Sequence, residues 1–203
     1  MTKTNALTAH SRDIKPGQWC DVGNRFLPCL FNELVDFIEI ETAWSHIVWG
    51  SKEDRAKYEP PFYASGWFRW RTWRSAQAGI DHLNWASSLV IDENMGVEPG
   101  DENYGKPTGQ AVGAKELLEL YTWWTKVYPN RQDPHDASGW SELCAKRHAA
   151  YPDDGFLFDD RTPGEREETR RVLDLSTELE KQYDKEDEEM MIRLIKIRDS
   201  LWT

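Results

Sequence analysis

The chain has 203 residues and a formal net charge of −11 at pH 7, with 36 acidic residues against 25 lysines and arginines. An acidic balance excludes non-specific binding to nucleic acid, which requires a basic surface. No apolar run approaches the roughly 20 residues that a membrane-spanning helix needs, so we expect no membrane partner. The three cysteines, Cys20, Cys29 and Cys144, lack metal-ligand spacing and are typical of small thiols in a reducing compartment.

Tryptophan is the most unusual component, with eleven copies in the chain. Ordinary soluble proteins use it far less than leucine, alanine, glycine or serine. Its side chain has a large apolar area and one N–H group, so it concentrates in cores, at interfaces and under flat ligands. We therefore predict a fold built around a few rigid aromatic anchors rather than a broad aliphatic core.

The first 150 residues carry helical signals and turn signals, with no trusted strand pattern and no evident internal repeat. Proline is favoured in a first helical turn, and serine is a favoured N-cap. On these grounds we expect helices over Pro28–Trp49, Ser65–Val90, Ala114–Tyr128 and Ser138–Ala149, with a charged loop over Gly50–Tyr63, a long surface loop over 92–112 and a turn-rich connector over Asn130–Asp136.

The last forty residues give the clearest prediction. Thr162, Pro163 and Glu165 have the order of an N-cap, a proline in the first turn and an acidic residue in the first turn, and no glycine or proline follows Gly164. We predict an all-α fold: a Trp-rich helical core over 1–160, with irregular connections, and a long C-terminal helix over 161–203. That helix packs on the core or projects from it, and its apolar stripe is a possible route to a homo-oligomer.

A candidate ligand face lies on the predicted Ser65–Val90 helix. Arginine stacks on aromatic rings and binds phosphate or carboxylate through two N–H groups, so arginines among indole rings could hold a flat anionic ligand such as a nucleotide. An alternative stays open, in which the arginines pair with acidic residues of the first predicted helix and the tryptophans fill the core. The residues that share this face are Trp70, Arg71, Arg74, Asp81, His82 and Trp85.

Two carboxylate pairs have helical spacing: Glu33 with Asp36, and Glu116 with Glu119. All-α nucleotide pyrophosphohydrolases hold Mg²⁺ with pairs of this kind, because the ion prefers oxygen ligands. Such short patterns also arise by chance in a chain with 36 acidic residues. We expect Mg²⁺, held by Glu33 and Asp36, only if the protein handles nucleotides, and no cofactor otherwise.

Motifs for catalysis are missing from the sequence. There is no glycine-rich phosphate loop, no G-x-S-x-G and no evident cysteine–histidine pair. We name no catalytic residue, and the sequence favours a protein that is not an enzyme.

Four segments carry a resemblance to a group of viral proteins. They are Lys15–Trp19, Leu34–Glu39, Leu120–Trp124 and Ile192–Thr203. In these segments the chain is similar to small uncharacterised proteins encoded by tailed bacteriophages. The resemblance implies a viral origin and action in the host bacterial cytoplasm or on the virion, and it implies no activity.

The leading hypothesis is a non-enzymatic phage-encoded interaction protein that binds a virion component or a host factor. The acidic composition, the long C-terminal helix and the missing catalytic motifs favour it. The alternative is an all-α protein that binds nucleotides or hydrolyses them with Mg²⁺.

Overall fold

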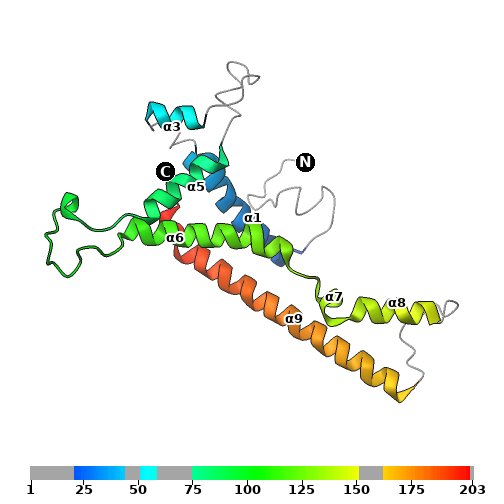
Figure 1. The fold of residues 1–203 in the computed structure, drawn as a ribbon. Helices are drawn as coiled ribbons and strands as arrows, with labels where there is room; N and C mark the ends of the chain where they lie inside the picture. Colours follow the sequence, from blue (N-terminus) through cyan, green and yellow to red (C-terminus); the bar gives the residue numbers. More distant parts are fainter. Residues whose placement is uncertain (1–20, 44–50, 59–74, 151–161, 202–203) are drawn as a thin grey trace. The chain divides into compact units, whose positions relative to one another are not determined.

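The computed structural model describes residues 21–43, 51–58, 75–150 and 162–201 (Figure 1). These residues form an all-α fold with a long C-terminal helix, as predicted, and the described part contains no β-strand beyond one isolated bridge between Val90 and Pro107. They divide into two compact units. Unit 1 comes from Met1–Lys126 and Met191–Thr203, and unit 2 from Val127–Met190.

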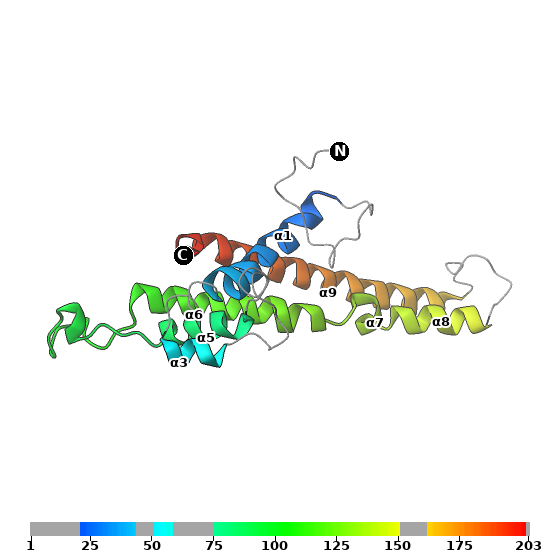
Figure 2. The same ribbon diagram turned by 90° about the horizontal axis from the view of Figure 1, so that it is seen from above.

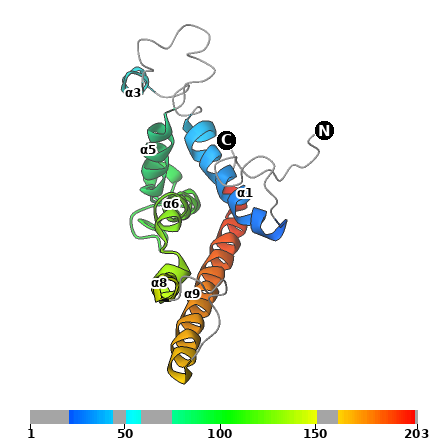
Figure 3. The ribbon, with the colours of Figure 1, turned by 90° about the vertical axis from the view of Figure 1, so that its right-hand side faces the viewer.

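Unit 1 is organised around α6. This helix packs against α1 and α5, and η1, which continues α1 as a π-helical turn, also packs against α5 (Figure 3). The last residues of the chain return to this unit through η5, which contacts α6. The elements are α1 (Gly23–Asp36), η1 (Phe37–Thr42), α3 (Lys52–Lys57), α5 (Ala76–Ser87), η2 (Glu93–Met95), α6 (Gly109–Thr122), the start of η3 (Trp123–Val127) and η5 (Arg198–Ser200).

Aromatic side chains join α1 to the end of α6. The fully buried Phe31 ring lies 5.0 Å from the Trp123 ring and 5.2 Å from the Trp124 ring, between centroids. The indole N–H of Trp124 donates to the Asn32 side-chain oxygen at 3.3 Å, which satisfies both buried polar groups. The prediction of a Trp-rich core is thus confirmed here, although only four of the eleven tryptophans lie in the described residues.

Unit 2 consists of short helices beside the N-terminal part of α9. Figure 2 shows α8 and α9 side by side, and side chains of α9 at three-four spacing, Thr169, Val172 and Ser176, are buried. Ser176 lies 3.1 Å from Nδ1 of His135, and Arg147 donates to the Thr169 hydroxyl at 2.7 Å. The elements are η4 (Tyr128–Asn130), α7 (Pro134–Ser138), α8 (Trp140–Ala150) and α9 (Pro163–Lys196).

The start of α9 confirms the prediction made from Thr162 and Glu165. The Glu165 carboxylate accepts from the Thr162 backbone N–H at 2.8 Å, and the Thr162 hydroxyl accepts from the Glu165 N–H at 3.2 Å. This reciprocal pair is a capping box, which satisfies two N–H groups that have no partner inside the helix. A local signal was sufficient here because both partners lie within one helical turn.

Several predicted boundaries were wrong. α1 begins at Gly23, and Pro28 lies inside it, where the buried face of the helix compensates for one missing backbone hydrogen bond. The predicted helix over Ser65–Val90 is not continuous: Ser75 has an extended backbone, α5 begins after it and ends at Ser87. The short helices α3 and α7 were missed because their sequences contain the charged and turn-forming residues of loops.

No helix in the described ranges combines the length and the apolar character that crossing a membrane requires.

Candidate functional site

The candidate site is the segment between α5 and α6, residues 89–108, which we call the double-turn loop. It reaches away from the ends of both helices (Figure 1 and Figure 2). Its base is closed by backbone hydrogen bonds: Ile91 N–H to Lys106 O at 2.9 Å, Gly105 N–H to Ile91 O at 2.8 Å and Thr108 N–H to Leu89 O at 3.1 Å. The Thr108 hydroxyl then accepts from Ala111 N–H at 3.0 Å and caps α6. Local bonds therefore fix both ends of this segment.

The first turn of the loop is Asp92-Glu93-Asn94-Met95-Gly96. The Asp92 carboxylate accepts from Asn94 N–H at 3.0 Å, and Met95 N–H donates to the Asp92 carbonyl at 3.0 Å. Gly96 has φ +76°, a left-handed conformation that is strained for residues with a side chain. This aspartate-initiated turn ends in the glycine that its geometry requires.

The second turn, Asp101-Glu102-Asn103-Tyr104-Gly105, repeats this arrangement nine positions later. The Asp101 carboxylate accepts from Asn103 N–H at 2.7 Å, Tyr104 N–H donates to the Asp101 carbonyl at 3.1 Å, and Gly105 has φ +78°. Both turns thus share the sequence Asp-Glu-Asn-X-Gly, where X is Met95 or Tyr104. No internal repeat was expected of the chain, and this five-residue pattern is a short recurrence within one loop that can be read directly from the sequence.

The side chains on the loop combine apolar and acidic groups. Met95 is 53% exposed, Tyr104 is 40% exposed, and Val90 at the base is also exposed. Between 92 and 106 the sequence holds five carboxylates and one lysine, Lys106, which forms a 3.6 Å ion pair with Glu102. An exposed ion pair of this length contributes little stability. Acidic side chains thus outnumber basic ones on the loop by five to one.

Asp81, one of the predicted ligand residues, lies in a polar cluster of unit 1. Its carboxylate forms an ion pair with Lys57 and accepts from the Tyr58 hydroxyl at 2.5 Å and from the Gln77 amide at 2.6 Å. These donors, Lys57 first, lower the pKa of Asp81 from 3.8 to about 2. The carboxylate therefore joins α3 to α5, and its charged form is the one that the structure stabilises.

We expect Asp81→Asn to lower the free energy of unfolding at neutral pH by about 1 kcal/mol, because partly exposed charged hydrogen bonds are screened by solvent. A carboxyl group whose pKa is lowered by folding adds stability above its unfolded pKa of 3.8, and this stability is lost as the pH falls toward about 2. Urea titrations of both proteins across this range should show the difference shrinking. The exposed Glu98→Gln is the control, and a difference independent of pH would contradict the assignment.

His82 and Trp85 remain close to one another on α5. Their ring centroids are 5.5 Å apart, and Trp85 is 56% exposed. Trp70, Arg71 and Arg74 lie outside the described residues. The extended Ser75 precedes α5, so this helix begins at Ala76, after the positions of those three residues in the sequence.

The two carboxylate pairs with helical spacing have different surroundings in the structure. Glu33 is exposed on α1 and Asp36 is half-buried, and no group of three or more metal-ligating side chains is found in the part of the chain that the structure describes. Glu116 and Glu119 both bind Arg193: Glu116 through two N–H groups at 2.7 and 2.9 Å, and Glu119 at 2.8 Å. This arginine lowers the pKa of Glu116 and ties the end of α9 to α6 within unit 1.

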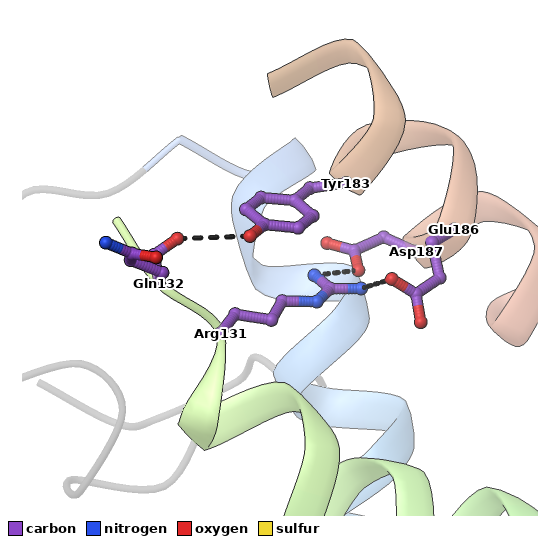
Figure 4. A network of polar contacts seen from close by, with 5 residues as sticks. All are labelled: Arg131, Gln132, Tyr183, Glu186 and Asp187. Carbon is purple, nitrogen blue, oxygen red and sulfur yellow. Dashed lines mark hydrogen bonds and ion pairs between the residues drawn. The ribbon is translucent and has the colours of Figure 1, made fainter. Parts of the chain in front are cut away.

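Unit 2 contains a polar cluster centred on Arg131 (Figure 4). Its guanidinium donates to Asp187 at 2.6 Å and to Glu186 at 2.7 Å. The guanidinium carbon also lies 4.8 Å from each of the ring centroids of Tyr128 and Tyr183. Desolvation raises the pKa of Asp187, and the arginine opposes this shift. The Arg131 guanidinium, with two tyrosine rings and two carboxylates around it, therefore holds η4 and α9 together.

We expect Arg131→Ala to lower the free energy of unfolding of unit 2 by about 2–3 kcal/mol, because removing the cation leaves two partly buried acids without it. Arg131→Lys should be intermediate, since lysine cannot donate to both carboxylates with a planar fork. Chemical denaturation followed by circular dichroism measures the change, with the exposed Arg171→Ala as control. Wild-type stability in the alanine variant would show that the cluster contributes nothing.

Comparison with protein-family models, with curated proteins and with solved structures found no match to this chain.

Proposed function

We propose that the protein is a non-enzymatic interaction protein, encoded by a tailed bacteriophage, that binds a virion component or a host factor. The observation that carries the proposal is the exposure of Met95 and Tyr104 on a segment fixed by its own hydrogen bonds. Large apolar side chains exposed on such a segment provide apolar area that a protein partner can bury.

Binding at such a surface is energetically favourable for two reasons. Burying an exposed tyrosine or methionine removes apolar area from water, at about 25 cal/mol per Å². A segment whose backbone is already fixed by local bonds also loses little conformational entropy when a partner binds. The phage setting rests on the resemblance in the sequence, and the loop supports a protein partner in either location.

Affinity capture tests the proposal. Immobilised full-length protein is incubated with purified tailed-phage virions and, separately, with bacterial lysate, and retained proteins are identified and their dissociation constants measured. We expect a partner with micromolar or tighter affinity, equivalent to about −8 kcal/mol. Retention of no partner from either source would contradict the proposal.

One observation favours the nucleotide-binding alternative: the exposed indole of Trp85 beside His82 offers a face on which a base could stack. A thermal-shift screen against nucleotides, with and without Mg²⁺, tests it. A ligand at a hundred times its dissociation constant stabilises a protein by about 2.7 kcal/mol. Stabilisation that is lost in Trp85→Ala would favour this alternative, and an unchanged melting temperature would exclude it.

A further inference from the structure

We propose that the double-turn loop is the recognition element of the protein, and that its partner is a basic protein surface with two apolar pockets, one for Met95 and one for Tyr104. This inference rests on the proposed function and adds the surface and the chemistry of the partner to it. Three properties of the loop carry it: the equivalence of the two turns, the exposure of their fourth residues and the charge around them.

The equivalence of the turns is the first step. Each turn is fixed by a carboxylate–amide bond and a backbone bond of nearly the same lengths, and the two terminating glycines differ by only 2° in φ. The shared bonds and the shared glycine conformation give the fourth residue a similar place in each turn. The two turns differ at the glycine, since Gly96 N–H donates to the Glu93 carbonyl and Gly105 N–H to the Ile91 carbonyl. Met95 and Tyr104 thus hold the same position in two similar turns, although their side chains differ.

The exposure of these side chains is the second step. The turn-forming residues direct their polar atoms to one another, since Asp92 and Asp101 accept from the backbone of their own turns. In each turn, a partner can therefore contact the fourth residue and the exposed second residue, which is Glu93 or Glu102. Tyrosine is enriched among the residues that dominate binding energy, and methionine adapts to irregular pockets.

Charge complementarity identifies the partner. With five carboxylates and one lysine between 92 and 106, the loop repels phosphate, which excludes nucleic acids and anionic membranes as occupants. Lysines or arginines around each pocket would instead attract Glu93 and Glu102 and orient the approach. An apolar contact with a charged rim is also the usual composition of a protein–protein interface.

A selection from a random peptide library on the immobilised full-length protein tests this chemistry without assuming a partner. We expect enrichment of peptides that combine lysine or arginine with large apolar residues. A synthetic peptide of the enriched sequence is then used as the probe in fluorescence anisotropy titrations. Enrichment of acidic peptides, or of peptides without charge, would overturn the inference.

Variants of the fourth residues locate the binding surface. Met95→Ser and Tyr104→Ser should each weaken probe binding about tenfold, and the double variant about a hundredfold if the two contacts are independent. Val22→Ser and Phe26→Ser are matched controls, because both side chains are similarly exposed apolar groups of unit 1 outside the loop. Circular dichroism should show that the four single variants and the double variant keep the wild-type fold.

Two further variants separate the parts of the inference. Exchanging the fourth residues, Met95→Tyr with Tyr104→Met, should leave the affinity within about threefold if the turns are equivalent. Glu93→Gln with Glu102→Gln should weaken binding and flatten its dependence on salt concentration. A loss of more than about tenfold in the exchanged variant would contradict the equivalence of the turns.

The outcomes distinguish the inference from the proposed function. If affinity capture finds a partner and the Met95→Ser, Tyr104→Ser double variant binds both that partner and the probe as tightly as wild type, the inference is overturned and the proposed function stands. If neither capture nor selection retains anything, both fail. Loss of partner and probe together in the double variant supports both.

Discussion

Phe31→Ala is expected to lower the free energy of unfolding of unit 1 by about 3–5 kcal/mol. The ring is fully buried between α1 and the end of α6, against the indoles of Trp123 and Trp124. Its removal eliminates both ring contacts and leaves a cavity that these large, rigid neighbours cannot easily fill. Urea titration measures the change, with tryptophan fluorescence and far-UV circular dichroism recorded together.

Phe26→Ala is the matched control for this substitution, because Phe26 lies on the same helix and is largely exposed. Its effect should stay within about 0.5 kcal/mol, as is usual for surface positions. An equal loss in the two variants would contradict a contribution specific to the aromatic cluster, because alanine raises the helix propensity at both positions. A shift of the midpoint without a change of slope would show that only the stability changed.

Gly79→Ala is expected to destabilise unit 1 by about 3 kcal/mol or more, which is large for the addition of one methyl group. A Cβ atom at this position would lie 1.9 Å from the carbonyl oxygen of Ile38 and 2.9 Å from its carbonyl carbon. Both are backbone atoms of η1, so no side-chain rotation can relieve the clash. The substitution must separate α5 from η1 or abolish their packing.

Gly109→Ala provides the control for Gly79→Ala. Gly109 begins α6, and nothing lies within 4 Å of the position that its Cβ would take. Alanine there should be neutral or should stabilise the protein by up to about 1 kcal/mol, because it reduces the entropy of the unfolded chain. Thermal and urea unfolding of both variants measure the contrast. Equal stability of Gly79→Ala and wild type would exclude a close approach between α5 and η1.

Part of the candidate site could have been predicted from the sequence. The long loop over 92–112 was predicted, and its glycines and aspartates specify the two turns through bonds that span two or three residues. The exposure of Met95 and Tyr104 could not be read, because an apolar residue in a loop is as often packed on the core. The exposed fractions of these side chains come only from the tertiary structure, in which the loop lies away from the ends of α5 and α6 (Figure 2).

For the predicted ligand face, the sequence pattern was less informative. Its residues were grouped by helical spacing, which is valid only within one continuous helix, and α5 begins after the extended Ser75. Asp81 was expected beside Arg71 and Arg74, which lie outside the described residues. The structure gives it Lys57 and Tyr58 as partners, more than twenty residues away in sequence. No spacing rule could have named them, since Lys57 ends a helix that was expected to be a loop and Tyr58 follows it directly.

The sequence alone determined the helical class and the start of α9 at its capping box, because these depend on interactions within one or two turns of the chain. The end of α9 was predicted too late, since the helix ends at Lys196 and not at the end of the predicted range 161–203. The tertiary structure alone decided which partners the charged residues take: Arg193 meets Glu116 and Glu119 more than seventy positions away. It also explains Gly79. In an isolated helix a glycine only lowers stability, but here the missing side chain permits the close contact between α5 and η1. Long-range packing brings these groups together, and local propensity carries no information about it.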